Sequence, residues 1–177
     1  CHKVGIVGEI FLKFNPFAQK DVTSWLINQK IEVIPPLISD FFMQGFVNLK
    51  VRQNQHLQRK LTPDFVIDWL YKKVQKQINK VNEIGKNFNY FTPFESIFEK
   101  AEKAKQVISL GTQFGEGWLI SGEILSFASQ GVNHVISLQP FGCIANHIVE
   151  KGIEKRIKSL CPQMNILSLD FDSSVSD

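Results

Sequence analysis

The chain has 177 residues and a mass of 20.2 kDa, which is the size of one ordinary domain. Its hydrophobic fraction of 44% supports a real core, which excludes a disordered protein and a miniprotein built on disulfides. The 20 basic and 17 acidic residues give a net charge of +3, too small to indicate nucleic-acid binding by itself. Three cysteines without a CxxC pair favour a reducing compartment, so we expect a cytoplasmic protein.

The domain organisation is simple. The longest uncharged stretch, residues 124–149, could span a bilayer by length, but Gln-Gly, Asn-His and Gln-Pro pairs interrupt it. We therefore predict a helix, a buried strand and a second helix there, and no membrane partner. The chain starts abruptly at Cys1 without methionine or signal peptide, which we interpret as a piece of a longer protein. We expect one domain over residues 1–172 and a tail over residues 173–177.

Four short runs rich in β-branched residues predict buried strands. They lie near residues 4–8, 31–34, 132–138 and 165–169. Capped helical patterns separate them, which is typical of an α/β fold. We predict a doubly wound, Rossmann-like sheet of about four parallel strands with flanking helices, whose first crossover is right-handed.

Caps and apolar periodicity predict the helices. The expected helices cover residues 16–30, short segments within 37–61 packed on the sheet, residues from Thr62-Pro63-Asp64 onward, residues from a capping box at Thr92–Glu95 toward Leu110, and residues 118–129 and 144–160.

The helix that starts after Pro63 has an apolar stripe and a basic side. The stripe consists of Val66, Leu70, Val74, Ile78 and Val81. The basic residues are Lys72, Lys73, Lys76, Lys80 and Lys86. They could bind an anionic ligand or nucleic acid, but a solvated helix face is the favoured interpretation, and we expect no nucleic-acid partner.

Two glycine patterns resemble phosphate-binding loops but lack the residues that such loops need. The run from Gly5 to Gly8 has no GxGxxG, so it carries no dinucleotide fingerprint. The run from Gly117 to Gly122 is followed by Glu123 instead of lysine. Nothing there neutralises a β- or γ-phosphate, so nucleotide hydrolysis is not predicted.

Cys143 is the main candidate for chemistry. The segment QPFGC ends a predicted buried strand and opens a helix, which is where open α/β sheets place their ligands. Free amides at a helix start favour a thiolate, the form that binds metal or attacks an electrophile. Gly142 allows an unusual backbone angle or the close approach of a bulky group. The alternative interpretation is that Cys143 is a buried apolar filler.

Four further residues are weaker candidates for the same crevice. His147 follows Cys143 by four residues and could share its helix face, as a base, a metal ligand or only a surface or capping histidine. Gly8 and Glu9 end the first strand, on the side of the sheet where Cys143 is expected. Glu116 lies between two glycines. For Glu9, Glu116 and the nearby Lys13 the alternative is an exposed loop charge.

These segments carry a family resemblance. The blocks VGIVGEI (residues 4–10), KFNPFA (13–18), GEGWL (115–119), QPFGC (139–143) and NHI (146–148) resemble the large acyl-CoA dehydratase activase-related proteins. The C-terminal parts of those proteins are similar to subunits of 2-hydroxyglutaryl-CoA dehydratase, an enzyme of anaerobic metabolism.

The resemblance implies a function and a cofactor. Dehydratase subunits of this type hold a 4Fe–4S cluster with three cysteines, and Cys143 is the position here that fits the third. In the family, an ATPase activase donates one electron, and a ketyl radical mechanism then removes water from a 2-hydroxyacyl-CoA. The other two cysteines and the activase modules would lie upstream of this chain. The chain alone is therefore expected to hold no cluster and to be inactive.

Three functions remain open from the sequence. The first is the cluster-binding part of a 2-hydroxyacyl-CoA dehydratase or activase, whose partners are the upstream ATPase modules and an acyl-CoA, with Cys143, Gly142, Gly8 and Glu9 at the site. The second is a non-catalytic docking or regulatory domain. The third is a thiol-dependent enzyme that uses Cys143 and His147.

Overall fold

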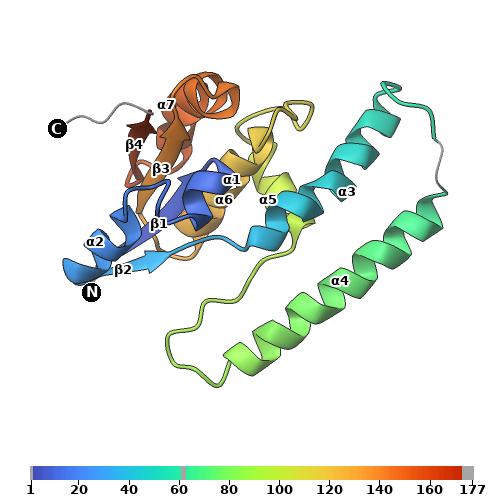
Figure 1. Ribbon diagram of the computed structural model, residues 1–177. Helices are drawn as coiled ribbons and strands as arrows, with labels where there is room; N and C mark the ends of the chain where they lie inside the picture. Colours follow the sequence, from blue (N-terminus) through green and yellow to red (C-terminus); the bar gives the residue numbers. More distant parts are fainter. Residues whose placement is uncertain (1, 61–62, 173–177) are drawn as a thin grey trace.

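The computed structural model describes residues 2–60 and 63–172. A sheet of four parallel strands in the order β2-β1-β3-β4 forms its centre (Figure 1). The strands are β1 (His2–Gly8), β2 (Ile31–Ile34), β3 (His134–Pro140) and β4 (Asn165–Phe171). The predicted doubly wound α/β fold is confirmed, and every strand lies within two residues of its expected bounds. The expected tail at residues 173–177 lies outside the described residues.

The strand register places the carboxyl ends of the two central strands, β1 and β3, side by side. Gly5 of β1 pairs with Val135 of β3, and the ladder continues to Gly8 opposite Leu138. β4 continues the sheet from His134 opposite Asn165. Because all four strands run in the same direction, their carboxyl ends form one edge, where ligands of open α/β sheets bind.

Alternation along the strands divides the core between the two faces of the sheet. Ile6, Ile136 and Leu138 pack with Leu12 and Leu26 from the helices that follow β1. The opposite face packs on α6 (Gly117–Ser129) and on the helical segment after β3. Side chains one residue apart in a strand point to opposite faces, so both faces are apolar and covered.

A second layer lies outside α6. Helix α3 (Ile38–Asn54) and helix α5 (Ile97–Ala104) pack on α6 through Met43, Val47, Ile97 and Trp118, among other residues. The indole Nε1 of Trp118 donates to Oδ1 of Asn48 at 2.7 Å. Short helices on the sheet were expected in residues 37–61. That prediction was wrong, because the pattern belongs to one 17-residue helix that packs on α5 and α6.

Helix α4 (Asp64–Gly85) begins after Pro63 as predicted and lies apart from the sheet (Figure 1). Thr62 lies outside the described residues. Only Ile67 and Gly85 of this helix are buried. The predicted apolar stripe therefore remains largely uncovered, with Leu70 at 45% and Val81 at 49% exposure.

The segment after β1 differs from the prediction. Helix α1 (Ile10–Phe14) replaces the expected loop, because Oε2 of Glu9 caps it by accepting from the amide of Leu12. Turns then lead to helix α2 (Val22–Asn28), which is shorter than the predicted helix. Left-handed backbone at Lys20 and Asp21, with φ of 50° and 55°, prevents an earlier start.

The predicted capping box at Thr92–Glu95 was placed one turn too early. In the structure Ser96 accepts from the amide of Glu99, and the Glu99 carboxylate accepts from the amide of Ser96. Helix α5 also ends at Ala104, before the expected Leu110. The real box has the same S-x-x-E pattern, so a second Ser/Thr-x-x-Glu match was present four residues downstream.

One helix was expected over residues 144–160, but the structure has a π-helix, η1 (Ala145–Glu150), followed by α7 (Lys151–Leu160). Short π segments inside helices are uncommon and concentrate at functional sites. Across residues 2–60 and 63–172, no helix is long and apolar enough to cross a membrane.

Candidate functional site

The candidate site lies where the order of strands changes direction. β2 lies on one side of β1, and the chain then crosses to β3 on the other side. In open α/β sheets this switch point opens a crevice at the carboxyl ends of the strands. A hollow of about 430 Å³ lies there, and its lining includes Glu9, Glu116, Gly142 and Cys143. The structure therefore brings together four of the residues that the sequence singled out.

Gly8 allows the end of β1 to lie close to β3 at this edge. Its φ is +109°, and an added Cβ would lie 2.2 Å from the carbonyl oxygen of Leu138. The next amide, of Glu9, donates to that same oxygen at 3.0 Å. Only glycine permits this close approach between the end of β1 and the backbone of β3. Gly8 therefore shapes the site through its backbone conformation.

Glu9 and Glu116 hold the first turn of α1 in place. Oε2 of Glu9 accepts from the amide of Leu12 at 3.0 Å, and Oε1 of Glu116 accepts from the amide of Ile10 at 2.7 Å. Glu116 is only 2% exposed. The interpretation of Glu116 as an exposed loop charge was therefore wrong, since it joins two segments 106 residues apart.

Burial raises the pKa of the Glu116 carboxyl above its usual value, and hydrogen bonds from backbone amides, including that of Ile10, oppose the shift in pKa. The positive charge of Lys13 opposes it further, while the neighbouring Glu9 adds to it. Desolvation has the larger effect because it disfavours the charged form of a buried carboxyl. The crevice therefore has two carboxyl groups in its wall, one of them held toward its neutral form.

Cys143 is half-buried in the lining of the hollow. A tight turn carries it there, since its amide donates to the carbonyl of Pro140 at 3.1 Å and Gly142 has a φ of +81°. The Cys143 carbonyl accepts from the amide of His147 at 2.8 Å, so the helical segment begins directly after the cysteine. Apart from its chain neighbours, no atom lies within 4 Å of the position that a Cβ of Gly142 would take.

His147 does not face Cys143. Its Nε2 lies 3.4 Å from Oδ1 of Asp170 on β4, and its ring stands edge-on to Phe141. The thiol of Cys143 instead donates to Oδ1 of Asn146 at 3.2 Å. A shared face four residues apart requires both residues within one α-helix, whereas Cys143 precedes the π-helix that begins at Ala145.

Lys13 is buried and is not among the residues that line the crevice. Its Nζ is 3.3 Å from both carboxylate oxygens of Glu123 on α6, and both side chains are almost fully buried. A second buried ion pair lies beside them, with 2.5 Å between Nζ of Lys100 and Oδ2 of Asp40. Buried charges need such partners because the interior cannot solvate them.

A buried polar network behind Cys143 was not predicted. The network consists of four residues with 0% exposure, namely Ser137 and Gln139 of β3 and Asn146 and Glu150 of η1. Hydrogen bonds connect them. A signal was present in the sequence, because Ser137 and Gln139 alternate within an apolar strand and so share one face.

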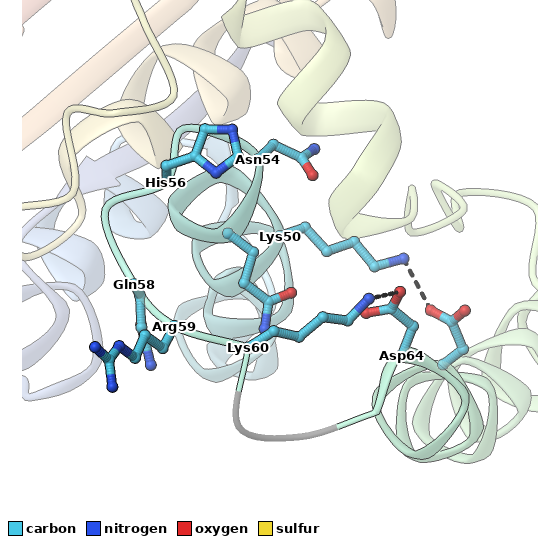
Figure 2. Close-up of a pocket in the computed structure, with 9 residues that line it drawn as sticks. Lys50, Asn54, His56, Gln58, Arg59, Lys60 and Asp64 are labelled. Atoms are coloured by element: carbon cyan, nitrogen blue, oxygen red, sulfur yellow. Dashed lines mark hydrogen bonds and ion pairs between the residues drawn. The ribbon is translucent and has the colours of Figure 1, made fainter.

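A larger hollow, of about 580 Å³, opens between the end of α3 and the start of α4. Figure 2 shows its lining, with Lys50, His56, Arg59 and Lys60 around an open surface. Lys50 pairs with Asp68 at 2.8 Å, and Lys60 pairs with Asp64. This hollow is remote from the strand ends and its lining is exposed, so it is a weaker candidate than the crevice at Cys143.

Comparison of the chain with protein-family models, with curated proteins and with solved structures finds no match. Within the described part of the chain, no three or more His, Cys, Asp or Glu side chains come together in a way that could hold a metal ion.

Proposed function

We propose that the crevice at the ends of β1 and β3 is a cluster-binding site, in which Cys143 supplies one thiolate ligand to an iron–sulfur cluster. The protein would then be part of a 2-hydroxyacyl-CoA dehydratase or its activase. The observation that carries this proposal is the position of Cys143, whose half-buried side chain lines a hollow at the switch point of the sheet.

The residues around the hollow suit a cluster that is completed from elsewhere. Cys143 is the one cysteine of its lining, and a 4Fe–4S cluster needs several cysteine ligands. Glu9 and Glu116 already accept from backbone amides, which leaves the thiol as the free soft ligand of this wall. Gly142 leaves open space at its own Cα in the wall of the hollow. This chain fits one corner of such a cluster, and the remaining ligands would come from the upstream part of the protein.

Each residue of the crevice has a defined task in this proposal. A bound cluster would supply one-electron chemistry to the substrate. Cys143 binds the metal, and Gly142 lets a bulky group approach it. Glu116 holds the first turn of α1 through the amide of Ile10, and burial raises the pKa of its carboxyl. Gly8 sets the distance between the two strand ends.

The partners follow from the same proposal. Upstream ATPase modules would deliver the electron in the cytoplasm, and an acyl-CoA would be the substrate of the complete protein. The exposed wall of the hollow includes Phe114 at 67% and Ile144 at 55% exposure. Such apolar side chains at the rim suit a covering domain or an acyl group.

A docking or regulatory domain is the second candidate, and helix α4 favours it. Leu70, Val74, Val81 and Ile84 are between 39% and 64% exposed along one side of this helix. An uncovered apolar face on a long helix is typical of an interaction surface. The thiol-dependent enzyme gains no comparable support, because His147 is paired with Asp170 and not with Cys143.

Anaerobic reconstitution of the complete natural protein with iron and sulfide tests the proposal. The cluster function predicts visible iron–sulfur absorbance that Cys143→Ala weakens strongly and that the matched control Cys161→Ala leaves unchanged, since Cys161 lies at the end of α7. A docking domain predicts the same absorbance, or none, whether or not Cys143 is present. Activity that alkylation abolishes in iron-free protein would favour the thiol-dependent enzyme instead.

A further inference from the structure

Helix α4 is anchored to the rest of the protein along one side. Oδ1 of Asn82 accepts from the amide of Phe94 at 2.8 Å, and Nδ2 of Asn82 donates to the Phe94 carbonyl at 2.9 Å. The ring of Tyr71 stands edge-on to that of Phe98, with 4.8 Å between the ring centroids. Gly85 is buried on the same side. These contacts determine which side of α4 faces the body of the protein.

The flank of α4 beside this anchored side has the heptad pattern of a helix that packs on another helix. From the buried Ile67 onward, positions a and d of the heptad are Ile67, Leu70, Val74, Gln77, Val81 and Ile84. The anchored residues Tyr71 and Gly85 occupy e positions of the same register. Four of the apolar a and d residues are between 39% and 64% exposed, and we call them the α4 seam: Leu70, Val74, Val81 and Ile84.

Lysines border the α4 seam on its outer side. Lys73 and Lys80 occupy the g positions of the register, and a g position lies directly beside the a and d residues. Neither lysine has an ion pair within residues 2–60 and 63–172, and Nζ of Lys73 instead lies 3.9 Å from the centre of the Trp69 ring. Residues 69–86 contain five lysines and one glutamate. The exposed seam therefore has a positively charged border.

The same charges disfavour a second copy of this chain as the occupant of the α4 seam. In an antiparallel pair of α4 helices the g positions face each other, so Lys73 and Lys80 of one copy would lie against those of the other. In a parallel pair a g position faces an e position, and the e residues Tyr71 and Gly85 already face the body. Like charges that face each other across two helices are destabilising.

A lipid surface also fits this geometry poorly. An α-helix turns by about 100° per residue, so Lys73 and Lys80 lie opposite the anchored Tyr71 and Asn82, and the α4 seam lies on the flank between them. A flat bilayer that approaches from outside would meet the lysines before the seam. A second helix laid along the flank can contact the seam and the lysines together.

We propose that α4 binds an acidic amphipathic helix, whose apolar side packs on the α4 seam and whose carboxylates pair with Lys73 and Lys80. This inference names the partner for the docking function, the second candidate above, and rests on that function for the role of α4. It requires nothing of the crevice at Cys143. Apolar packing supplies most of the affinity, and the two lysines select the partner by charge.

The test measures the binding of two labelled synthetic peptides to this chain by fluorescence anisotropy. The first peptide is a helix of four heptads with Ile at a, Leu at d and Glu at e and g, and the second has Lys in place of every Glu. We expect the Glu peptide to bind about tenfold more tightly than the Lys peptide, and added salt to reduce the difference. Lys73→Glu/Lys80→Glu should reverse the preference, so that the Lys peptide binds more tightly.

Two further variants separate the α4 seam from net charge and from stability. Lys72→Glu/Lys76→Glu makes the same change in charge on the same helix, but at positions f and c of the heptad, away from the seam. This control should still prefer the Glu peptide. Val74→Ser/Val81→Ser should weaken binding of the Glu peptide about tenfold, with a thermal midpoint close to that of the unsubstituted chain because both side chains are exposed.

The outcomes distinguish the acidic partner from the docking function itself. Equal affinity for the two peptides, lost in Val74→Ser/Val81→Ser, would overturn the acidic partner and leave docking at the α4 seam in place. Binding of the Glu peptide that Val74→Ser/Val81→Ser does not weaken would overturn both. Binding of neither peptide would overturn the inference. Attachment of the chain to phosphatidylserine vesicles would then assign α4 to a lipid surface, and a dimer that Val74→Ser/Val81→Ser dissociates would assign it to a second copy.

Discussion

Lys13 and Glu123 form an ion pair inside the protein, with 3.3 Å between Nζ and Oε1 and side chains only 2% and 1% exposed. The pair joins the helix after β1 to α6 across 110 residues of sequence. It therefore fixes α1, which follows β1, to α6 in the core. Removal of one partner leaves a buried charge without compensation, which is the costly case for such pairs.

We predict that Lys13→Met lowers the free energy of unfolding by about 3–5 kcal/mol. The double variant Lys13→Met/Glu123→Leu should recover most of that loss, because both desolvated charges are gone. Urea denaturation of the two single variants and the double variant measures the coupling directly. Strictly additive effects would show that the two side chains do not interact in solution.

Gly8→Ala should be far more damaging than Gly142→Ala. Both glycines have left-handed backbone, with φ of +109° and +81°, so both substitutions carry the same kind of strain. A Cβ at Gly8 would meet the backbone of Leu138, whereas a Cβ at Gly142 has open space. We expect a loss of about 1 kcal/mol at Gly142 and at least twice that at Gly8. Thermal unfolding compares them, and equal losses would contradict the close passage of β1 over β3.

The strands and the switch point could be predicted from the sequence because they depend on local pattern. The β-branched run that ends at Gly8 and the run before Pro140 each predict a buried strand, and parallel strands place both ends at one edge. The position of Cys143 at that edge followed from the same pattern, and the hollow there contains it.

What the sequence did not predict depends on partners that are distant in the chain. Lys13 was weighed as a crevice or loop residue, but Glu123 lies 110 positions away, and no local pattern connects the two. Glu116 likewise reads as a loop charge from the sequence, because its hydrogen-bond donor, the amide of Ile10, lies 106 residues away. The π-helix cannot be read from periodicity, because apolar residues at Ile144 and Ile148 fit an α-helix equally well.

The stability of the protein should depend on pH through Glu150. Burial is the largest cause that raises the pKa of this carboxyl above its ordinary value of 4.5, while Ser168, Lys151 and Ser137 oppose the shift in pKa. Between pH 4.5 and the raised pKa, Glu150 keeps a proton in the folded state that it has lost in the unfolded state. The contribution of Glu150 to the free energy of unfolding is therefore fully present below pH 4.5. It declines as the pH rises through this window.

Glu150→Gln should remove that pH dependence. A glutamine can still accept from Gln139 and can donate to the Ser168 hydroxyl, so we expect the variant to be more stable at pH 7 and no more stable at pH 4. Chemical denaturation at the two pH values measures the difference. A variant that is less stable at pH 7 would show that the ionised carboxylate is needed in the network.

Cys143 should be alkylated severalfold faster than Cys161 in this chain. Both thiols are free and half-buried, but only Cys143 lines the hollow, directly before the start of a helical segment. A reagent can therefore reach the Cys143 sulfur through the hollow. Iodoacetamide labelling followed by peptide mass spectrometry gives both rates in one sample. If Cys161 reacts as fast as Cys143, the crevice gives its cysteine no special reactivity.

The most direct measurement of the role of Cys143 is the electron paramagnetic resonance spectrum of the complete natural protein after anaerobic reconstitution and reduction. Cys143→Ser should abolish or clearly alter the signal of a reduced iron–sulfur cluster, because the ligand at the crevice has changed. Cys161→Ser, made at the end of α7, should leave the same signal in place. A cluster signal that is identical in the unsubstituted protein and in Cys143→Ser would contradict the assignment of the crevice as a cluster site.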